Sequence, residues 1–239
     1  MALNAAKIQS TGGGDRVEQD NLEPGVYKAR IVQIIDFGVQ PQRAFQGKEK
    51  PPAQEIGITY ELLDEFMKDE DGNDLEDKPR WISENFPLHS LKADMAKSTK
   101  RYKALDPTEE FGGNWPDLIE YPCMVTIINN PGKEGKVYDN VGNVSAMRPR
   151  DAANAPELVN EAKVFDLDAP DMEVFNKLPK WIQDKIKGNL GFKSSPLEKA
   201  LAGGAQEAEK PAKAAPKKGK KVEEDPPFDA DDAGDNNPY

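Results

Sequence analysis

Carboxylates are the side chains best suited to chemistry in this 239-residue chain, because it contains only one cysteine and one histidine. Cys123 lies in a short apolar run, which predicts a buried structural thiol, and no second cysteine exists to form an intramolecular disulfide. A lone His89 excludes metal centres built from several imidazoles. Asp36, Glu61 and Glu84 are the candidates for a carboxylate and metal nuclease, but their spacing converges on no site. We therefore predict that the protein is not an enzyme, with no catalytic residues, no metal and no cofactor.

The acidic segment Asp64–Asp77 does not fit a calcium-binding loop. If Gly72 is aligned with the invariant glycine of such a loop, Met67 takes the first ligand position and Lys78 the twelfth, where a carboxylate is required. The sequence Asp71-Gly72-Asn73 instead predicts a hairpin turn between two strands.

A second kind of chemistry needs no catalytic group. Single-stranded nucleic acid is bound by cations that follow the phosphates and by aromatic rings on which bases stack. Residues of both types lie in two predicted loops and on the strands beside them. The candidate contacts are Lys28, Arg30, Arg43, Phe45, Lys48, Lys50, Arg80, Trp81, Lys133, Lys136 and Tyr138. The alternative interpretation, in which the cations only solubilise and the rings pack in the core, stays open.

The net charge of -11 is concentrated in two segments. Asp64–Asp77 carries eight acids and one lysine, and Glu223–Tyr239 carries seven acids and no cation. Each segment therefore contributes -7, and removing their -14 from -11 leaves +3 for the rest of the chain. A mildly cationic remainder allows a basic groove in an acidic protein.

The acidic tail, Glu223–Tyr239, follows a segment from Lys210 to Lys221 with six lysines and no acid. Such charge-segregated sequence cannot bury enough apolar surface to offset the entropy of ordering, so we predict a disordered arm that acts by binding a partner or the protein's own basic groove. A solubilising tail is the alternative. The residues proposed for partner binding are Asp225, Pro227, Phe228, Asp231, Asp232, Pro238 and Tyr239, with either Phe228 or Tyr239 as the anchor.

Alternation of apolar and polar residues predicts strands at Gly25–Phe37, Gln54–Leu63, Arg80–Phe86, Cys123–Asn129 and Lys136–Met147. In the first strand, one predicted face carries Tyr27, Ala29, Ile31, Gln33 and Ile35, and the other carries Lys28, Arg30, Val32 and Ile34. In the second and third strands, the outward positions are Gly57, Thr59, Glu61, Trp81, Ser83 and Asn85.

Helical periodicity predicts two helices, at Leu88–Leu105 and at Lys180–Leu190. The first would bury Leu88, Leu91, Met95, Tyr102 and Leu105 and turn Lys92, Lys97, Lys100, Arg101 and Lys103 to the opposite side. The second would pack through Trp181, Ile182 and Ile186.

Three strands, a helix and two more strands form the order of the five-stranded oligonucleotide-binding (OB) barrel. We predict a mainly β fold of this type, with a helix between strands three and four, a short C-terminal helix and disordered termini. The predicted divisions are a flexible N-terminus at 1–22, the barrel at 23–150, a helical extension at 151–192 and a disordered tail, Lys-rich and then acidic, at 193–239.

An ordered series of short segments resembles a family of bacteriophage single-stranded DNA-binding proteins. The resemblance covers about Leu22 to Leu190 and is carried by Gly25–Tyr27, Ile34–Gln40, Tyr60–Leu62, Ile82–Ser83, Phe86–Leu91, Tyr121–Val125, Val137–Val141, Phe165–Asp168 and Leu178–Ile186. It implies an OB barrel with a C-terminal helical extension, acting in phage DNA replication, recombination or repair. Where that family has a basic and aromatic pair in strand three, this chain has Glu84-Asn85-Phe86.

The tail looks like the acidic tip of bacterial single-stranded DNA-binding proteins, which implies recruitment of replication and recombination proteins. We therefore expect a non-catalytic protein of the host cell cytoplasm that coats single-stranded DNA with little sequence preference. No apolar run approaches the length of a membrane span, so no membrane partner is expected, while a homo-oligomer remains open. The alternative function is a protein-interaction module or DNA mimic whose acidic segments bind a nuclease or repressor.

Overall fold

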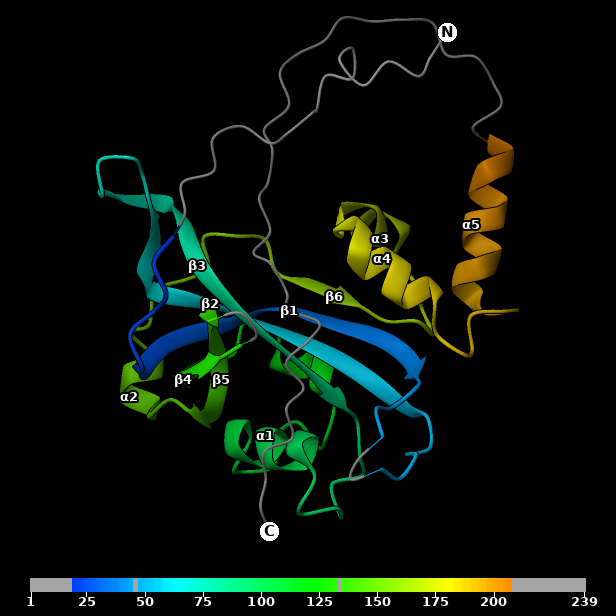
Figure 1. Ribbon diagram of the computed structural model, residues 1–239, viewed down its shortest axis with the longest axis horizontal. Coiled ribbons are helices and arrows are strands. Elements are labelled where there is room, and N and C mark those ends of the chain that lie inside the picture. Colours follow the sequence, from blue (N-terminus) through cyan, green and yellow to red (C-terminus); the bar gives the residue numbers. More distant parts are fainter. Residues whose placement is uncertain (1–18, 45–46, 133–134, 208–239) are drawn as a thin grey trace, which may run out of the picture.

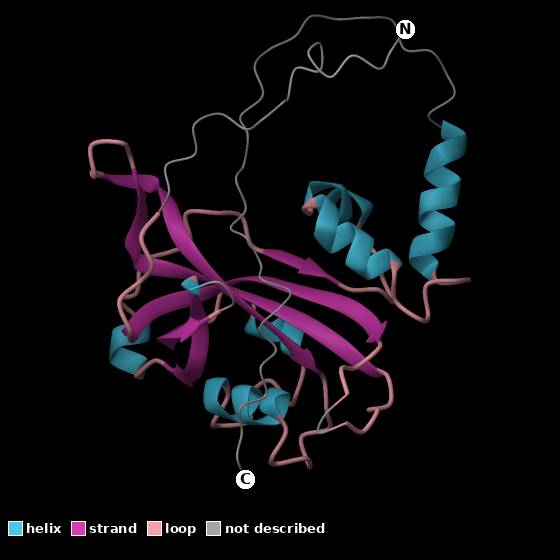
Figure 2. Cartoon of the chain, in the orientation of Figure 1, coloured by secondary structure: helices cyan, strands magenta, loops and turns pink. Residues whose placement is uncertain are grey.

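The computed structural model describes residues 19–44, 47–132 and 135–207. It is mainly β, as predicted, with few helices (Figure 1, Figure 2). In chain order the elements are β1 Gly25–Gln40, β2 Ala53–Lys68, β3 Asp74–Pro87, α1 Lys97–Leu105, the 3-10 helix η2 Trp115–Leu118, β4 Pro122–Pro131, β5 Val137–Ala146, α2 Pro149–Ala152, β6 Lys163–Phe165, α3 Met172–Lys177, α4 Lys180–Lys187 and α5 Pro196–Glu207.

The strands form one sheet in the order β3-β2-β1-β4-β5, with β1 as the shared central strand. β1 pairs antiparallel with β2 along most of its length and with β4 through its first six residues. Further along, β6 takes the place of β4 and pairs with β1 in parallel. In the view of Figure 1, α1 lies below the sheet, and α3 and α4 lie above β6.

The predicted strand count of five is not confirmed, because β6 adds a sixth strand within the segment expected to be helical. A strand of three residues is too short to produce a periodic pattern in the sequence. The sheet is also not closed by backbone pairing: within the described residues, no ladder joins β3 to β5.

The predicted faces of β1 are correct only as far as Ile31. Ile31 pairs with Tyr60 and Gln33 pairs with Thr59, so Val32 is an extra residue in β1, a β-bulge. Because side chains alternate with a period of two, one extra residue exchanges the two faces beyond it. Ile34 therefore joins the core that contains Ile31, while Gln33 turns to the opposite side.

Apolar side chains consequently pack on both sides of the sheet. The inner cluster contains Ile31, Ile34, Ile58, Tyr60 and Leu62 together with residues of β3, β4, β5 and α1. The outer cluster joins Ile35 and Phe37 to Phe165, Phe175, Leu178, Ile182, Ile186 and Leu197 from the C-terminal segment. The C-terminal extension is thus packed directly against the outer side of β1. Its last helix, α5, lies within residues 193–239, the segment predicted to be disordered.

A glycine allows the outer cluster to approach the sheet. A Cβ on Gly57 would lie 2.6 Å from Cε2 of Phe37, closer than real Cβ contacts come, so the phenyl ring occupies the space that a side chain would need. The bulge in β1 between Asp36 and Gly38 places Phe37 over this position.

Side chains bridge the gap between β3 and β5, and Arg101 of α1 is the main bridge. Its Nε donates to Oε1 of Glu84 on β3 at 3.0 Å, and its Nη2 donates to the carbonyl of Val141 on β5 at 3.0 Å. Nη1 donates to Oδ1 of Asn143 at 3.1 Å. Tyr60 donates its hydroxyl to Glu84, and burial beside that carboxylate raises the pKa of Tyr60, which keeps the hydroxyl proton in place.

The helix prediction around Arg101 was partly wrong. Helix α1 begins at Lys97, nine residues later than expected, and the side chains of Leu91 and Met95 are exposed. Arg101 was expected on the solvent side but is 6% exposed. Helical periodicity alone does not reveal that a buried carboxylate on another strand needs a cation.

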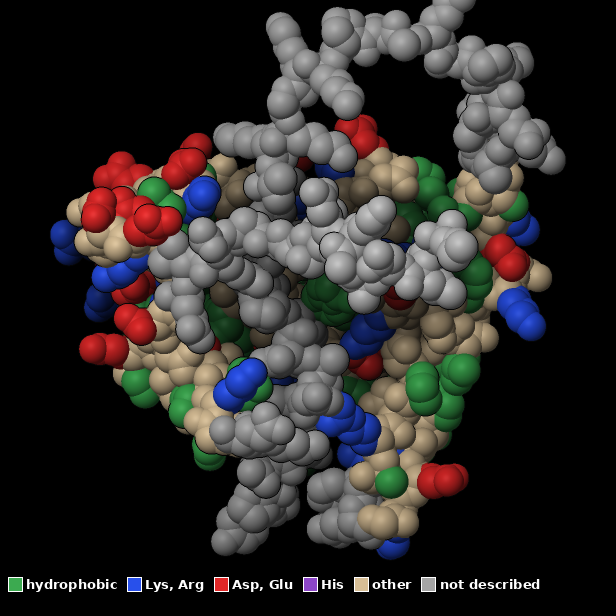
Figure 3. Space-filling view, turned by 45° about the horizontal axis from the view of Figure 1, so that its top comes forward, with side chains coloured by type: hydrophobic (Ala, Val, Ile, Leu, Met, Phe, Trp, Pro, Cys, Tyr) green, Lys and Arg blue, Asp and Glu red, His purple; other side chains and the backbone are tan. Residues whose placement is uncertain are grey.

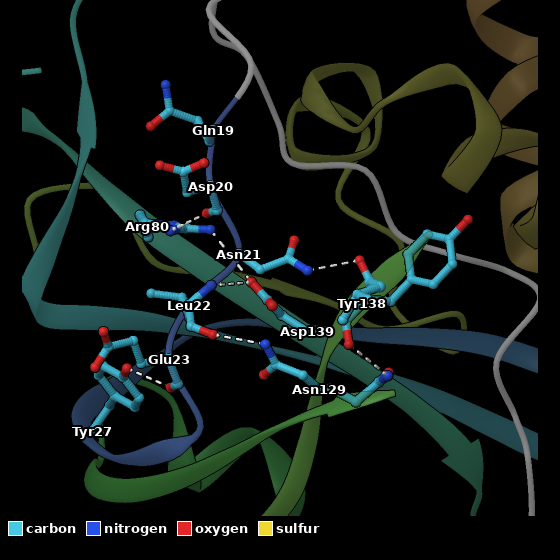
Figure 4. A network of polar contacts seen from close by, with 12 residues as sticks. Gln19, Asp20, Asn21, Leu22, Glu23, Tyr27, Arg80, Asn129, Tyr138 and Asp139 are labelled. Atoms are coloured by element: carbon cyan, nitrogen blue, oxygen red, sulfur yellow. Dashed lines mark hydrogen bonds and ion pairs between the residues drawn. The ribbon is translucent and has the colours of Figure 1, made fainter. Parts of the chain in front are cut away.

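The described N-terminal residues form a strap across the same gap (Figure 4). Leu22 donates its backbone N–H to Asp139 on β5 at 2.9 Å and accepts from Asn129 on β4 at 3.0 Å. Arg80 on β3 donates to the carbonyl of Asp20 at 2.8 Å and pairs with Asp139 at 3.4 Å. Residues 19–22 were predicted to be flexible, but Leu22 is buried in the inner cluster.

The fold confirms the prediction for the cysteine. Cys123 is buried, as predicted, and burial raises the pKa of its thiol, which disfavours the reactive thiolate. Among the described residues, no helix has the length and apolar character needed to cross a membrane.

Replacing Arg101 with Leu should lower the free energy of unfolding by about 3 kcal/mol, because the buried Glu84 carboxylate would lose its buried cation and keep only the half-exposed Lys97 as an ion-pair partner. Urea denaturation followed by tryptophan fluorescence measures the change. Lys103→Ala is the matched control on the same helix, since its ion pair with Asp94 is exposed to solvent and should contribute little to stability. Equal losses for the two variants would contradict the bridging role of Arg101.

Candidate nucleic-acid interface

Three rows of paired residues cross the outer side of β1, β2 and β3, the side against which α4 packs. The strand register places one residue of each strand in each row. The rows are Arg30, Glu61 and Trp81, then Gln33, Thr59 and Ser83, then Ile35, Gly57 and Asn85. The predicted outward positions of β2 and β3 are confirmed, and β1 reaches the same face through its bulge.

Trp81 is held in one orientation by a buried carboxylate. Its Nε1–H donates to Oε2 of Glu61 at 3.0 Å, and Glu61 is 1% exposed. The same carboxylate accepts from the backbone of Val159 at 2.7 Å and from Nδ2 of Asn160 at 2.7 Å. Glu61 therefore joins the indole on β3 to the segment that leads into β6, and the part-exposed ring has a fixed position.

An open cleft lies beside Trp81. It is lined by Trp81 and Ser83 of β3 and by Pro179, Trp181 and Ile182 at the start of α4. The floor consists of residues from β1 and β2, namely Gln33, Ile35, Phe37, Gly57 and Thr59. The sequence predicted Trp181 as a packing residue together with Ile182 and Ile186. Those two isoleucines are buried, but the Trp181 side chain is 36% exposed at the cleft.

The predicted cations separate into groups. Arg43, Lys48 and Lys50 are exposed in the connection between β1 and β2, and Lys28 is exposed near the start of β1. Lys136 is exposed at the other end of the sheet, beside β5. Phe45 and Lys133 lie outside the described residues. Lys180, next to Trp181, has an 86% exposed side chain and was not among the predicted contacts.

Two predicted phosphate contacts are instead engaged in the fold. Arg30 donates to the carbonyls of Pro156, Glu120 and Ala155 at 2.6, 2.8 and 3.1 Å. Arg80 is committed to the N-terminal strap through Asp20 and Asp139. Both arginines still contribute positive charge to the surface potential, but hydrogen bonds to acceptors within the protein fix the direction of their guanidinium groups.

Tyr138 also lies apart from the cleft. Its ring covers Gly132 in the loop between β4 and β5, where a Cβ on the glycine would lie 2.1 Å from Cε2 of the tyrosine. Figure 4 shows Tyr138 at the edge of the strap network, next to Asp139. The structure therefore does not bring Tyr138 and Trp81 together as neighbouring stacking platforms on one cleft.

The acidic side chains of Asp64–Asp77 are kept at one end of the molecule. They occupy the outer end of the β2–β3 hairpin, which Figure 3 shows as the group of acidic side chains at the upper left. The turn itself is closed by Asp69, whose carboxylate accepts from the backbone of Asp71 and Asn73 at 2.9 and 2.8 Å. These hydrogen bonds, above all those from Asn73, lower the pKa of Asp69.

The three carboxylates considered for catalysis do not converge. Glu61 accepts a hydrogen bond from Trp81, and Glu84 accepts one from Arg101. Asp36 accepts a hydrogen bond from the backbone N–H of Gly38 at 2.7 Å. Burial raises the pKa of Asp36. Within the part of the chain that the structure describes, no group of three or more His, Cys, Asp or Glu residues is placed to hold a metal ion.

Sequence reasoning missed two residues that line the cleft, Gln33 and Trp181, and the exposed cation Lys180 next to Trp181 in the chain. Gln33 was assigned to the core face because the bulge at Val32 leaves no mark in a run of β-branched residues. Trp181 was assigned to packing because helix periodicity places it beside Ile182. Lys180 follows Pro179, and the Pro-Lys-Trp sequence at a helix start was the signal that both side chains project from the first turn. The tail residues proposed for partner binding, Asp225 to Tyr239, lie outside the described residues.

Glu61 and Trp81 should be energetically coupled. Glu61→Gln removes the charged acceptor, and Trp81→Phe removes the indole N–H, so each should destabilise the fold by about 1–3 kcal/mol through the partner left behind. The double variant should lose about 0.5–1.5 kcal/mol less than the sum, as a double-mutant cycle from urea denaturation measures. Asp64→Asn, at an exposed acid three residues further along the same strand, provides the control and should show no coupling. Strict additivity of Glu61→Gln and Trp81→Phe would argue against the positioning role of Glu61.

Comparison with known proteins provides no relative from which a role could be transferred. No protein-family model and no curated protein matches the chain. The interpretation of the cleft therefore rests on its own geometry.

Proposed function

We propose that this protein binds single-stranded DNA on the outer side of β1, β2 and β3 and performs no reaction on it. The observation that carries the proposal is the part-exposed indole of Trp81, fixed by Glu61 in a cleft that the exposed Trp181 also lines. A fixed flat ring at an open surface accepts an unpaired base, and stacking of this kind contributes about 1–3 kcal/mol per base. Pre-organisation by Glu61 reduces the entropy that binding would otherwise cost.

The strand order supports the same proposal. In the proposed fold, β3-β2-β1-β4-β5 is a partly open OB barrel whose β3 and β5 edges are joined by Arg101, Arg80 and the strap. The ligand face of such barrels lies on strands two and three and is flanked by the loops between strands one and two and between strands four and five. Trp81 lies on that face, and Lys48 and Lys136 lie in or beside those loops.

Phosphate contacts in this proposal come from exposed cations around the face, in particular Lys28, Arg43, Lys48, Lys50, Lys136 and Lys180. Each neutralised phosphate releases counterions, so binding should weaken as salt rises. The acidic hairpin end keeps a large part of the negative charge away from the cleft, which lets an acidic protein attract a polyanion locally.

The acidic tail has two roles in the proposal. It recruits replication and recombination proteins through Phe228 or Tyr239, and it competes with DNA for the cations of the face. A phage-encoded protein of the host cytoplasm that coats exposed strands during replication, recombination or repair would need both properties.

A second candidate function is a DNA mimic, which the projecting acidic hairpin favours. In that case the eight acids of Asp64–Asp77 would occupy the DNA site of a nuclease or repressor. Retention of labelled poly-dT on a filter by the purified protein distinguishes the two functions, because a mimic would not retain the strand.

Trp81→Ala should weaken binding of dT oligomers by about 1–3 kcal/mol of binding free energy, because one stacked base is lost. Titrations monitored by tryptophan quenching at two salt concentrations measure the affinity and the salt slope together. Trp81→Phe keeps a ring and should retain most of the affinity, while both variants lose the bond to Glu61. No quenching by dT, or equal affinities for the wild type and Trp81→Ala, would refute the proposed site.

Deletion of residues 223–239 should tighten binding of dT oligomers at low salt, because seven carboxylates no longer compete for the basic face. The gain should shrink as salt rises, since screening weakens the competition. Replacing all seven acids of the tail with their amides at full length provides the control for chain length. Unchanged affinity at low salt would refute autoinhibition and leave DNA binding itself intact.

A further inference from the structure

Strand β6 extends the outer side of the sheet beyond β1 (Figure 1). Val164 of β6 packs against the inner cluster and Phe165 belongs to the outer cluster, so the side chains of β6 alternate as in a regular strand. Lys163 lies two residues before Phe165 and pairs with Gln33, which is itself on the outer side. The side chain of Lys163 therefore projects to the outer side of the sheet, which also carries Trp81.

The ammonium group of Lys163 is not used by the fold. The residue is partly exposed, and among the described residues its side chain forms no hydrogen bond and no ion pair. The nearest acid along the chain, Glu161, pairs instead with Lys177 of α3 at 3.5 Å. Removing part of the water around a cation costs free energy unless an anion takes its place. The surface at β6 is therefore suited to an anionic group from a ligand.

Glu61 fixes the position of Lys163 relative to Trp81. Its carboxylate accepts from the indole of Trp81 at 3.0 Å, and from the backbone N–H and the side-chain amide of Asn160 at 3.3 and 2.7 Å. Lys163 follows Asn160 by three residues, at the first position of β6, where the ladder to β1 holds its backbone. The ring and the cation are thus attached to one frame, although they lie far apart in the chain.

The separation of the two side chains suits a strand of nucleic acid. β3, β2, β1 and β6 are successive neighbours in the sheet. Adjacent strands lie about 4.8 Å apart, which places the backbones at Trp81 and Lys163 about 15 Å from each other. An oligonucleotide-binding fold covers about 4–16 nucleotides, so one bound strand can reach both. Val159, whose N–H also bonds to Glu61, is 53% exposed and offers apolar surface, not an acid, in the same segment.

We propose that Lys163 binds a backbone phosphate of the strand that stacks on Trp81, so that β6 forms an additional part of the DNA-binding face. This inference rests on the proposed binding of single-stranded DNA. It assigns a role in binding to the C-terminal extension, beyond the strands and loops of the barrel itself. Because phosphates carry no sequence information, the contact should strengthen binding of every strand alike.

Lys163→Gln should be titrated with dT oligomers over a range of salt concentrations. It should bind about threefold more weakly than the wild type at low salt, the effect of one exposed ion pair. The slope of log affinity against log salt should become shallower by about 0.7, the value for one phosphate of a single strand. Lys163→Arg keeps the charge and should keep the wild-type slope.

Lys100→Gln is the matched control. Lys100 is an exposed lysine of α1, which packs on the inner side of the sheet, so the variant removes the same charge away from the DNA-binding face. It should keep the wild-type affinity and slope. If Lys163→Gln does not fold, Lys163→Met keeps the aliphatic part of the side chain and takes its place.

The results distinguish this inference from the proposed function. Equal affinities and equal salt slopes for Lys163→Gln and Lys100→Gln would overturn the contact at Lys163 and leave the proposed function in place. A wild-type protein that does not bind dT oligomers would instead refute the proposed function.

Discussion

A single extra residue in β1 is the constraint on which the cleft and both apolar clusters depend. Side chains of a strand alternate between two faces, so the bulge at Val32 exchanges the faces in the middle of the longest shared strand. Before it, β1 contributes Ile31 to the inner cluster. After it, Gln33 and Ile35 reach the outer side, and the C-terminal extension finds an apolar surface on which to pack. Without the bulge, Gln33 would point into the inner cluster instead of the outer side.

Glu61 connects this sheet to the surface that we propose binds DNA. Burying a carboxylate is costly unless it is well hydrogen-bonded, and Glu61 accepts from the indole of Trp81, from the Val159 and Asn160 backbone and from the Asn160 amide. One of these bonds fixes the ring, and the other three attach the segment that leads into β6 and then α4. Helix α4 carries Trp181, which also lines the cleft. Glu61 therefore helps to position both Trp81 and the segment that precedes Trp181.

Ion pairs inside the fold, exposed cations and the acidic segment Asp64–Asp77 occupy different parts of this protein. The inner sheet edges are joined by ion pairs that are buried or partly buried, Arg101 with Glu84 and Arg80 with Asp139, which serve the fold. Exposed cations are present beside the outer face, as in the connection between β1 and β2, and also on α1 at the other side of the sheet, whereas the acids of Asp64–Asp77 lie at the outer end of a long hairpin. Because exposed charges separated by more than about 10 Å are screened at 0.1 M salt, such separation permits a locally basic face in a chain with net charge -11.

Regular alternation of apolar and polar residues predicted the mainly β class, the positions of the five longer strands, the outward pattern of β2 and β3 that exposes Trp81, and the buried Cys123, because alternation indicates directly which side of a strand faces the core. Other features could be seen only once the chain was folded. The bulge at Val32, the three-residue β6, the burial of Arg101 and the place of Trp181 each depend on partners far away in the chain, and local periodicity carries no information about a partner that packs from outside the window. For that reason the outward side chains of β2 and β3, Trp81 among them, could be predicted, whereas the places of Gln33 and Trp181 could not.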